Sequence, residues 1–127
     1  MADLETTRNH LASLDTDAVV VWLGRFESSA RAERLVQAFD VLATWHRPRA
    51  VLLMAGPSSE PAVAASLLRY VAELGLVGSW VYPDAPQAVV EAFRARADVL
   101  VEGAIPDRPA IDLAVALERA LLERALS

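Results

Sequence analysis

Four short apolar runs, each followed by a stretch with helical spacing, constrain this chain more than any other feature of its sequence. The runs are residues 18–23 (AVVVWL), 50–55 (AVLLMA), 79–82 (SWVY) and 97–101 (ADVLV). They do not alternate between apolar and polar residues, and they are rich in β-branched and aromatic side chains, which is typical of strands buried on both faces of a sheet. The runs therefore predict parallel strands joined by helices.

The intervening stretches predict five helices. A leading helix covers residues 2–13, and a second begins after Ser28 or Ser29, either of which can cap it, and ends before Arg47-Pro48. A third lies between the turn GPSSEP and Gly75, a fourth covers residues 84–95, and a long last helix runs from Pro109 to about residue 125.

This order of elements predicts an α/β fold with about four parallel strands. Right-handed crossovers place helices on both faces of such a sheet, so we expect a Rossmann-like three-layer sandwich with strand order 3-2-1-4. Residues 1–127 form a single domain, with a leading helix over 1–14, a core over 15–101 and a C-terminal helix over 109–126.

Composition excludes several classes of protein and site. The chain lacks cysteine, so disulfides and thiolate metal sites are ruled out, and a net charge of −5 without a basic cluster argues against binding to nucleic acid. No apolar run is long enough to span a bilayer, and the polar start MADLETTRNH is unlike a secretory signal, so we expect a cytoplasmic protein. His10 and His46 are 36 residues apart and are interpreted as structural, so no metal site is expected.

The ends of the first and fourth strands mark the expected binding crevice. The chain reverses direction between these two strands, and ligands of such sheets bind at that point, outside the carboxyl ends. Gly24-Arg25 follows the first strand and Glu102-Gly103 follows the fourth, so these pairs should face each other. An arginine beside a helix N-terminus can hold a diphosphate through two parallel hydrogen bonds. The alternative is a solvated Arg25 that pairs with Glu27.

Three segments resemble, in this order, successive units of a known family. They are VVVWLGRFESSARAERLVQAF (19–39), VLLMAGPSSEPAVAASLLRYVAELGL (51–76) and SWVYPDAPQAVVEAFRARADVLV (79–101). They resemble the strand-loop-helix units of the C-terminal, donor-binding domain of retaining GT-B glycosyltransferases of family 4, the glycosyl transferases group 1. The resemblance covers roughly residues 8–101, and the order and spacing of the segments carry it.

This resemblance implies a domain that binds a nucleotide-diphosphate sugar. It implies hexosyl transfer with retention, without a bound metal or other cofactor, and with a partner that supplies the acceptor half of the enzyme. Glu102 is then the catalytic residue, in contact with the donor sugar. The residues that would contact the substrate lie at the carboxyl ends of the strands: Gly24, Arg25, Arg31, Gly56, Ser58, Tyr82 and Gly103.

The chain also departs from the family pattern. The family places a lysine six residues after the glycine of Gly-Arg, where this chain has Ala30 followed by Arg31. The second glutamate of the Glu-x7-Glu motif is replaced by Ala110, and the further strands and the acceptor-binding domain have no counterpart. These departures favour the alternative function, a non-catalytic α/β domain that acts as an interaction or scaffold module.

Each candidate residue has a structural interpretation beside the functional one. Residues 56–59 can form a capped turn that needs no ligand, and Arg31 can be a solvent-facing helix residue. Tyr82 can be a packed core residue, and Glu102 can cap a backbone group or pair with Arg108.

The expected edge position of the fourth strand predicts assembly. Its unpaired backbone groups and the leucine-rich last helix invite another chain, so we expect a homodimer or a complex with a larger protein through one of these two elements. The leucines are Leu113, Leu117, Leu121 and Leu122. The residues expected in the core are Val20, Trp22, Leu53 and Val99.

Overall fold

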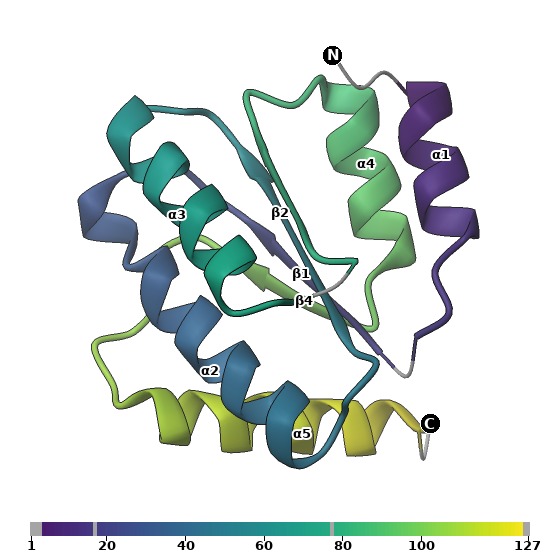
Figure 1. Ribbon diagram of the computed structural model, residues 1–127, viewed down its shortest axis with the longest axis vertical. Helices are drawn as coiled ribbons and strands as arrows, with labels where there is room; N and C mark the ends of the chain where they lie inside the picture. The colour runs from purple at the N-terminus through teal and green to yellow at the C-terminus, as the bar shows by residue number, and fades with distance from the viewer. Residues whose placement is uncertain (1–3, 17, 77, 126–127) are drawn as a thin grey trace.

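The computed structural model, which describes residues 4–16, 18–76 and 78–125, contains one sheet of four parallel strands (Figure 1). The strands are β1 (Val19–Leu23), β2 (Val51–Gly56), β3 (Trp80–Pro83) and β4 (Val99–Glu102). Their order is β3-β2-β1-β4, which confirms the predicted topology. Each predicted strand is present and shifted by no more than two residues at either end.

Five α-helices accompany the sheet in the described part of the chain. They are α1 (Leu4–Ala12), α2 (Ala32–Trp45), α3 (Pro61–Glu73), α4 (Gln87–Arg96) and α5 (Ala110–Ala125). The predicted serine cap of α2 is wrong. Ser28–Ala30 instead form a 3₁₀ turn, and Arg31, with a φ of 55°, stands at the N-cap of α2 without a side-chain cap bond.

The helices cover both faces of the sheet. Helices α2, α3 and α5 lie on one face and α1 and α4 on the other (Figure 1). Right-handed crossovers from β1 to β2 and from β2 to β3 run in the same direction and place α2 and α3 together. The crossover from β3 to β4 runs back across the sheet, so α4 lies on the opposite face.

The sheet separates two apolar cores. Trp22 and Met54 point toward α2, α3 and α5, whereas Val21 and Leu53 point toward α4, where Phe93 packs on them. Val20, Trp22 and Leu53 are fully buried, as predicted.

The expected burial of Val99 is wrong, because β4 is an edge strand. Val99 and Val101 are half-buried and pack against the core on the α5 side, while Leu100 and Glu102 are exposed on the opposite face. Helix α4 covers β1 and β2 and does not reach far enough to bury Leu100.

Helix α5 packs on α2 through part of its leucine-rich face. Leu117 and Leu121 are buried, Leu113 is half-buried, and Leu122 remains 51% exposed. The predicted apolar face is therefore satisfied in part within the chain. In the part of the chain that the structure describes, no helix combines the length and apolar character needed to cross a membrane.

Candidate functional site

The carboxyl ends of β1 and β2 meet in a tight glycine contact. The Gly24 amide donates to the carbonyl of Ala55 at 3.2 Å. Gly56 has a φ of +151°, and a Cβ atom at this position would lie 1.7 Å from the carbonyl oxygen of Gly24. Only glycine at position 56 permits this close approach, which shapes the floor of the site.

A cleft of about 400 Å³ opens above this floor. Its walls are the ends of β1 and β2, Asp84 after β3, and Ala85, Gln87 and Val90 before and on α4. The hollow thus lies on the α4 side of β1 and β2, whereas the sequence predicted a crevice between β1 and β4.

The ends of β1 and β4 do lie side by side, but hydrogen bonds close the space between them. Leu23 is in register with Glu102. The Gly103 amide donates to the carbonyl of Leu23 at 2.9 Å, and Trp22 Nε1 donates to the carbonyl of Gly103 at 2.9 Å. The amide and the carbonyl of Gly103 are therefore both hydrogen-bonded within the fold, and the amide is not available to a ligand.

Arg25 is the predicted site residue with the freest side chain. It is exposed, and its Nη1 lies 3.5 Å from Ser59 Oγ, at the limit of a hydrogen bond. Among the residues that the structure describes, Arg25 forms no ion pair, so the alternative of a pair with Glu27 is not realised in this geometry.

The carboxylate of Glu60 binds the helical turn that follows β1. Its carboxylate accepts from the Ser28 amide at 3.2 Å and from the Ser28 hydroxyl at 2.9 Å. The free amides of such a turn are the groups that would hold a phosphate. In this chain the carboxylate of Glu60 binds the Ser28 amide in place of a phosphate.

The carboxylate of Asp84 binds a backbone amide of the loop that follows β2. Its carboxylate accepts from the Ser58 amide at 2.8 Å, and its own amide donates to the carbonyl of Gly56 at 2.7 Å. Asp84 has a φ of +56°, a conformation that residues other than glycine seldom adopt. In each of the two turns best suited to an anion, a carboxylate of the same chain therefore already accepts a hydrogen bond from a backbone amide.

Arg31 lies apart from the cleft. Its Nη1 donates to the carbonyl of Ile105 at 3.4 Å, and the Ile105 amide donates to the carbonyl of Ala30 at 2.8 Å. These contacts join the turn before α2 to the loop after β4. They hold Arg31 on the α2 side of the sheet, opposite to the cleft.

Tyr82 and Glu102 are both held by other side chains. Tyr82 is 8% exposed and stacks on Trp80 with ring centroids 5.3 Å apart. Glu102 is exposed and pairs with Arg94 on α4 at 3.2 Å. Arg94, and not the predicted alternative partner Arg108, is thus the ion-pair partner of Glu102. The carbonyl of Arg108 accepts a hydrogen bond from Arg34 at 2.6 Å.

No metal centre is evident within residues 4–16, 18–76 and 78–125, where no three histidine, aspartate or glutamate side chains gather closely enough to hold an ion. His10 packs edge-on against Trp80 with centroids 4.9 Å apart, so it belongs to the aromatic packing under α1. His46 is exposed and follows the last residue of α2.

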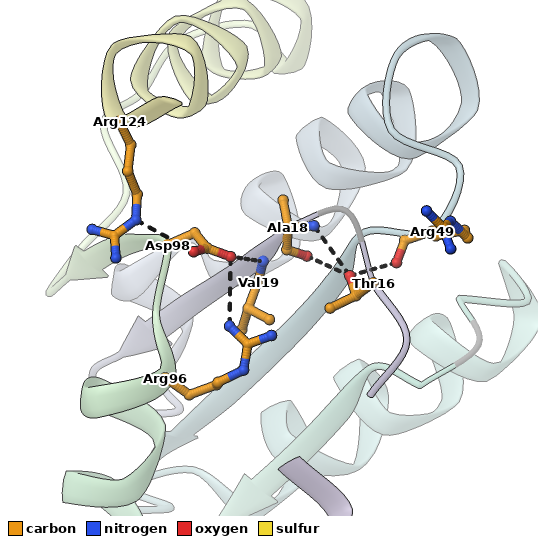
Figure 2. A network of polar contacts seen from close by, with 7 residues as sticks. All are labelled: Thr16, Ala18, Val19, Arg49, Arg96, Asp98 and Arg124. Atoms are coloured by element: carbon orange, nitrogen blue, oxygen red, sulfur yellow. Dashed lines mark hydrogen bonds and ion pairs between the residues drawn. The ribbon is translucent and has the colours of Figure 1, made fainter. Parts of the chain in front are cut away.

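A polar network that was not predicted from the sequence lies at the opposite, amino end of the sheet (Figure 2). Asp98 accepts from the amide of the buried Val19 at 2.8 Å, and its carboxylate pairs with Arg124 at 3.3 Å and with Arg96 at 3.6 Å. Beside it, the Thr16 hydroxyl lies 2.6 Å from the carbonyl of Arg49. An aspartate directly before an apolar strand was the available signal, because aspartate is disfavoured in strands unless it bonds to backbone.

Fold and site together define a small Rossmann-like parallel α/β domain with a shallow cleft at the carboxyl end of its sheet. No protein-family model matches the chain, and a search of curated proteins finds no similar sequence.

Proposed function

We propose that this domain is a non-catalytic interaction module that binds protein through α2 and α5. The observation that carries the proposal is the position of its exposed apolar side chains. Six large hydrophobic residues are exposed in the described part of the chain, and four of them lie on these two helices. They are Trp45 at 75%, Ile111 at 58%, Val115 at 52% and Leu122 at 51%.

The three side chains on α5 line a groove of about 300 Å³ between the two helices, together with Val41 on α2, and Trp45 is the last residue of α2. We call this surface, formed by Val41, Trp45, Ile111, Val115 and Leu122, the α2/α5 face. Contiguous apolar surface on a small domain is typical of a protein interaction site.

A salt bridge holds the two helices of this face in place. The guanidinium of Arg47 donates to both carboxylate oxygens of Glu118 at 3.0 Å, and both side chains are largely buried. Such a two-point contact fixes the relative position of the helices more strictly than a single bond does. The α2/α5 face is therefore a preformed surface.

The polar contacts of the turns after β1 and β2 also support a non-catalytic role. A phosphate that entered either turn would have to displace Glu60 from Ser28 or Asp84 from Ser58. It would also meet the charge of the displaced carboxylate. Both effects lower the affinity for a nucleotide diphosphate.

Arg25 supports a second candidate, the glycosyltransferase-like donor domain. Arg25 directly follows Gly24 of the cleft floor, and its exposed guanidinium has no ion-pair partner among the described residues. In this second candidate, Arg25 holds the diphosphate of a nucleotide sugar, and another protein supplies the acceptor half.

Calorimetric titration with UDP, GDP and their sugars separates the two candidates. We expect no saturable heat at about millimolar nucleotide, the concentration at which a binding free energy of roughly 4 kcal/mol is detected. The matched variants are Arg25→Ala and Arg69→Ala, since Arg69 is an exposed arginine on α3 away from the cleft.

One outcome would overturn the interaction module in favour of donor binding. In that outcome the wild type and Arg69→Ala bind the nucleotide saturably, and Arg25→Ala binds it roughly ten- to a hundredfold more weakly, which is the loss expected for a charge-assisted hydrogen bond.

A further inference from the structure

We infer that the partner of the α2/α5 face is a second copy of this chain, bound through an antiparallel contact between the two α5 helices. This inference rests on the proposed function. Helix α5 lies at the periphery of the molecule, with α2 along one side (Figure 1). Its outward face carries Ile111, Val115 and Leu122.

The spacing of these residues is self-complementary. Ile111, Val115 and Leu122 are separated by four and seven residues, so they form one stripe along the helix. When a second α5 lies antiparallel on the first, with Ile111 opposite Leu122, the centre of the contact falls between residues 116 and 117. Val115 of each copy then lies close to this centre, and the three side chains meet the same three of the other copy, as a two-fold interface requires.

The charges beside the stripe select the antiparallel direction. Asp112 and Arg119 are exposed, and by helical spacing both lie on the flank of the stripe opposite Glu118, the residue that bonds to Arg47 at the end of α2; Arg119 also borders the groove. Among the described residues neither side chain has a hydrogen-bond or ion-pair partner. They are seven residues apart, about 10 Å along one helix, which is too far for a pair within the chain. In the antiparallel arrangement Asp112 comes within about 3 Å, along the axis, of Arg119 of the other copy.

Two-fold symmetry makes this contact twice, once at each side of the centre. The same flank of both helices meets in an antiparallel pair, so each aspartate faces an arginine. In a parallel pair the charged flank of one α5 would face the α2 side of the other copy, and both charges would remain unpaired.

Trp45 adds a large apolar side chain near the centre of this contact. The bond from Arg47 to Glu118 places the end of α2 beside the middle of α5. Trp45, two residues before Arg47, is 75% exposed. Tryptophan is enriched at the energetic centre of interfaces because it buries much area at a small cost in side-chain entropy.

The free edge of β4 is the other candidate for self-association, and it is less suited. The strand has four residues and ends in the exposed carboxylate of Glu102. Short strands with charged ends discourage edge-to-edge pairing.

Charge reversal tests the pairing directly. We expect a dimer by sedimentation equilibrium, and we expect Asp112→Arg and Arg119→Asp each to weaken it about tenfold, since each change turns two attractions into two repulsions. An equimolar mixture of the two variants should recover wild-type affinity, because in the mixed dimer two arginines on one α5 face two aspartates on the other. The double variant, which exchanges the two charges within one chain, should recover it as well. A mixture that stays as weak as its components would overturn the antiparallel pairing.

A matched pair of apolar variants tests the surface. Leu122→Glu should weaken the dimer by at least about a hundredfold, because a carboxylate would be desolvated within the contact. Leu68→Glu, at a similarly exposed position on α3, should leave it unchanged, with circular dichroism as the folding control. A dimer insensitive to Leu122→Glu, or a monomer at all concentrations, would overturn the inference. The nucleotide titration does not depend on self-association, so a monomer that binds no nucleotide would overturn this inference alone.

Discussion

At the scale of single residues, Gly56 is the position where backbone geometry and the site are most closely linked. Its φ of +151° is one that side chains with a Cβ atom rarely adopt, and the carbonyl of Gly24 fills the space that a Cβ atom would need. The carbonyl belongs to the backbone after β1 and cannot move without breaking the bond from Gly24 to Ala55.

We therefore expect Gly56→Ala to lower the free energy of unfolding in urea by at least about 3 kcal/mol, from backbone strain and overlap together. The matched control is Gly75→Ala, because Gly75 also has a positive φ, +67°, but no atom lies within 4 Å of its Cβ position. The control should lose only about 1–2 kcal/mol, the strain of the left-handed backbone alone. Equal losses in the two variants would show that the contact with Gly24 is not tight.

At the scale of secondary structure elements, Asp98 joins three of them (Figure 2). It binds the first residue of β1 through an amide, and the ends of α4 and α5 through Arg96 and Arg124. The amide of Val19 is buried, so the carboxylate satisfies a donor that water cannot reach.

Asp98→Ala should lower the free energy of unfolding by about 1–3 kcal/mol, because it leaves the Val19 amide without an acceptor. The control is Asp15→Ala, which removes an exposed ion pair with Arg49 and should cost less than about 1 kcal/mol. Hydrogen exchange gives an independent readout, since the Val19 amide should exchange faster in Asp98→Ala. An unchanged exchange rate at Val19 would contradict the assigned bond.

At the scale of the whole molecule, the two apolar cores lie on opposite faces of one sheet. Every residue of β1 and the first five of β2 are buried, and alternate residues contribute to each core. Loss of packing on one face would expose β1 and β2, and the packing on the other face depends on the same two strands.

We expect the domain to unfold in one cooperative step. Trp22 reports on the core beneath α2, α3 and α5, and Trp80 reports on the opposite face beside α1. In a Trp45→Phe background, tryptophan fluorescence and far-ultraviolet circular dichroism should give the same midpoint in urea. An earlier fluorescence transition would show that the α1 and α4 layer unfolds separately.

Much of the architecture was predictable from local pattern. The apolar runs over residues 18–23 and 50–55 predicted the two central strands, and the helical spacing between the runs predicted the alternating helices. From these, right-handed crossovers led to the observed strand order. Periodicity is a local property, so it does not depend on which distant residues meet.

The state of the candidate site depended on contacts between distant residues. Ser28 and Glu60 are 32 residues apart, and Ser58 and Asp84 are 26 residues apart, yet these pairs decide whether an amide is free for an anion. The exposure of Leu100 likewise follows from how far α4 extends over the sheet.

The sequence by itself therefore determined the strands, the helices and their order, because hydrophobic spacing dictates which face of each element must be buried. Only the tertiary structure decided which polar groups remain available and which apolar ones stay exposed. Glu60 and Asp84 reach the amides because the loops after neighbouring parallel strands converge at one edge of the sheet. Leu117 and Leu121 are buried because their side of α5 packs on the core, whereas Leu122 lines the open groove between α2 and α5 and stays exposed.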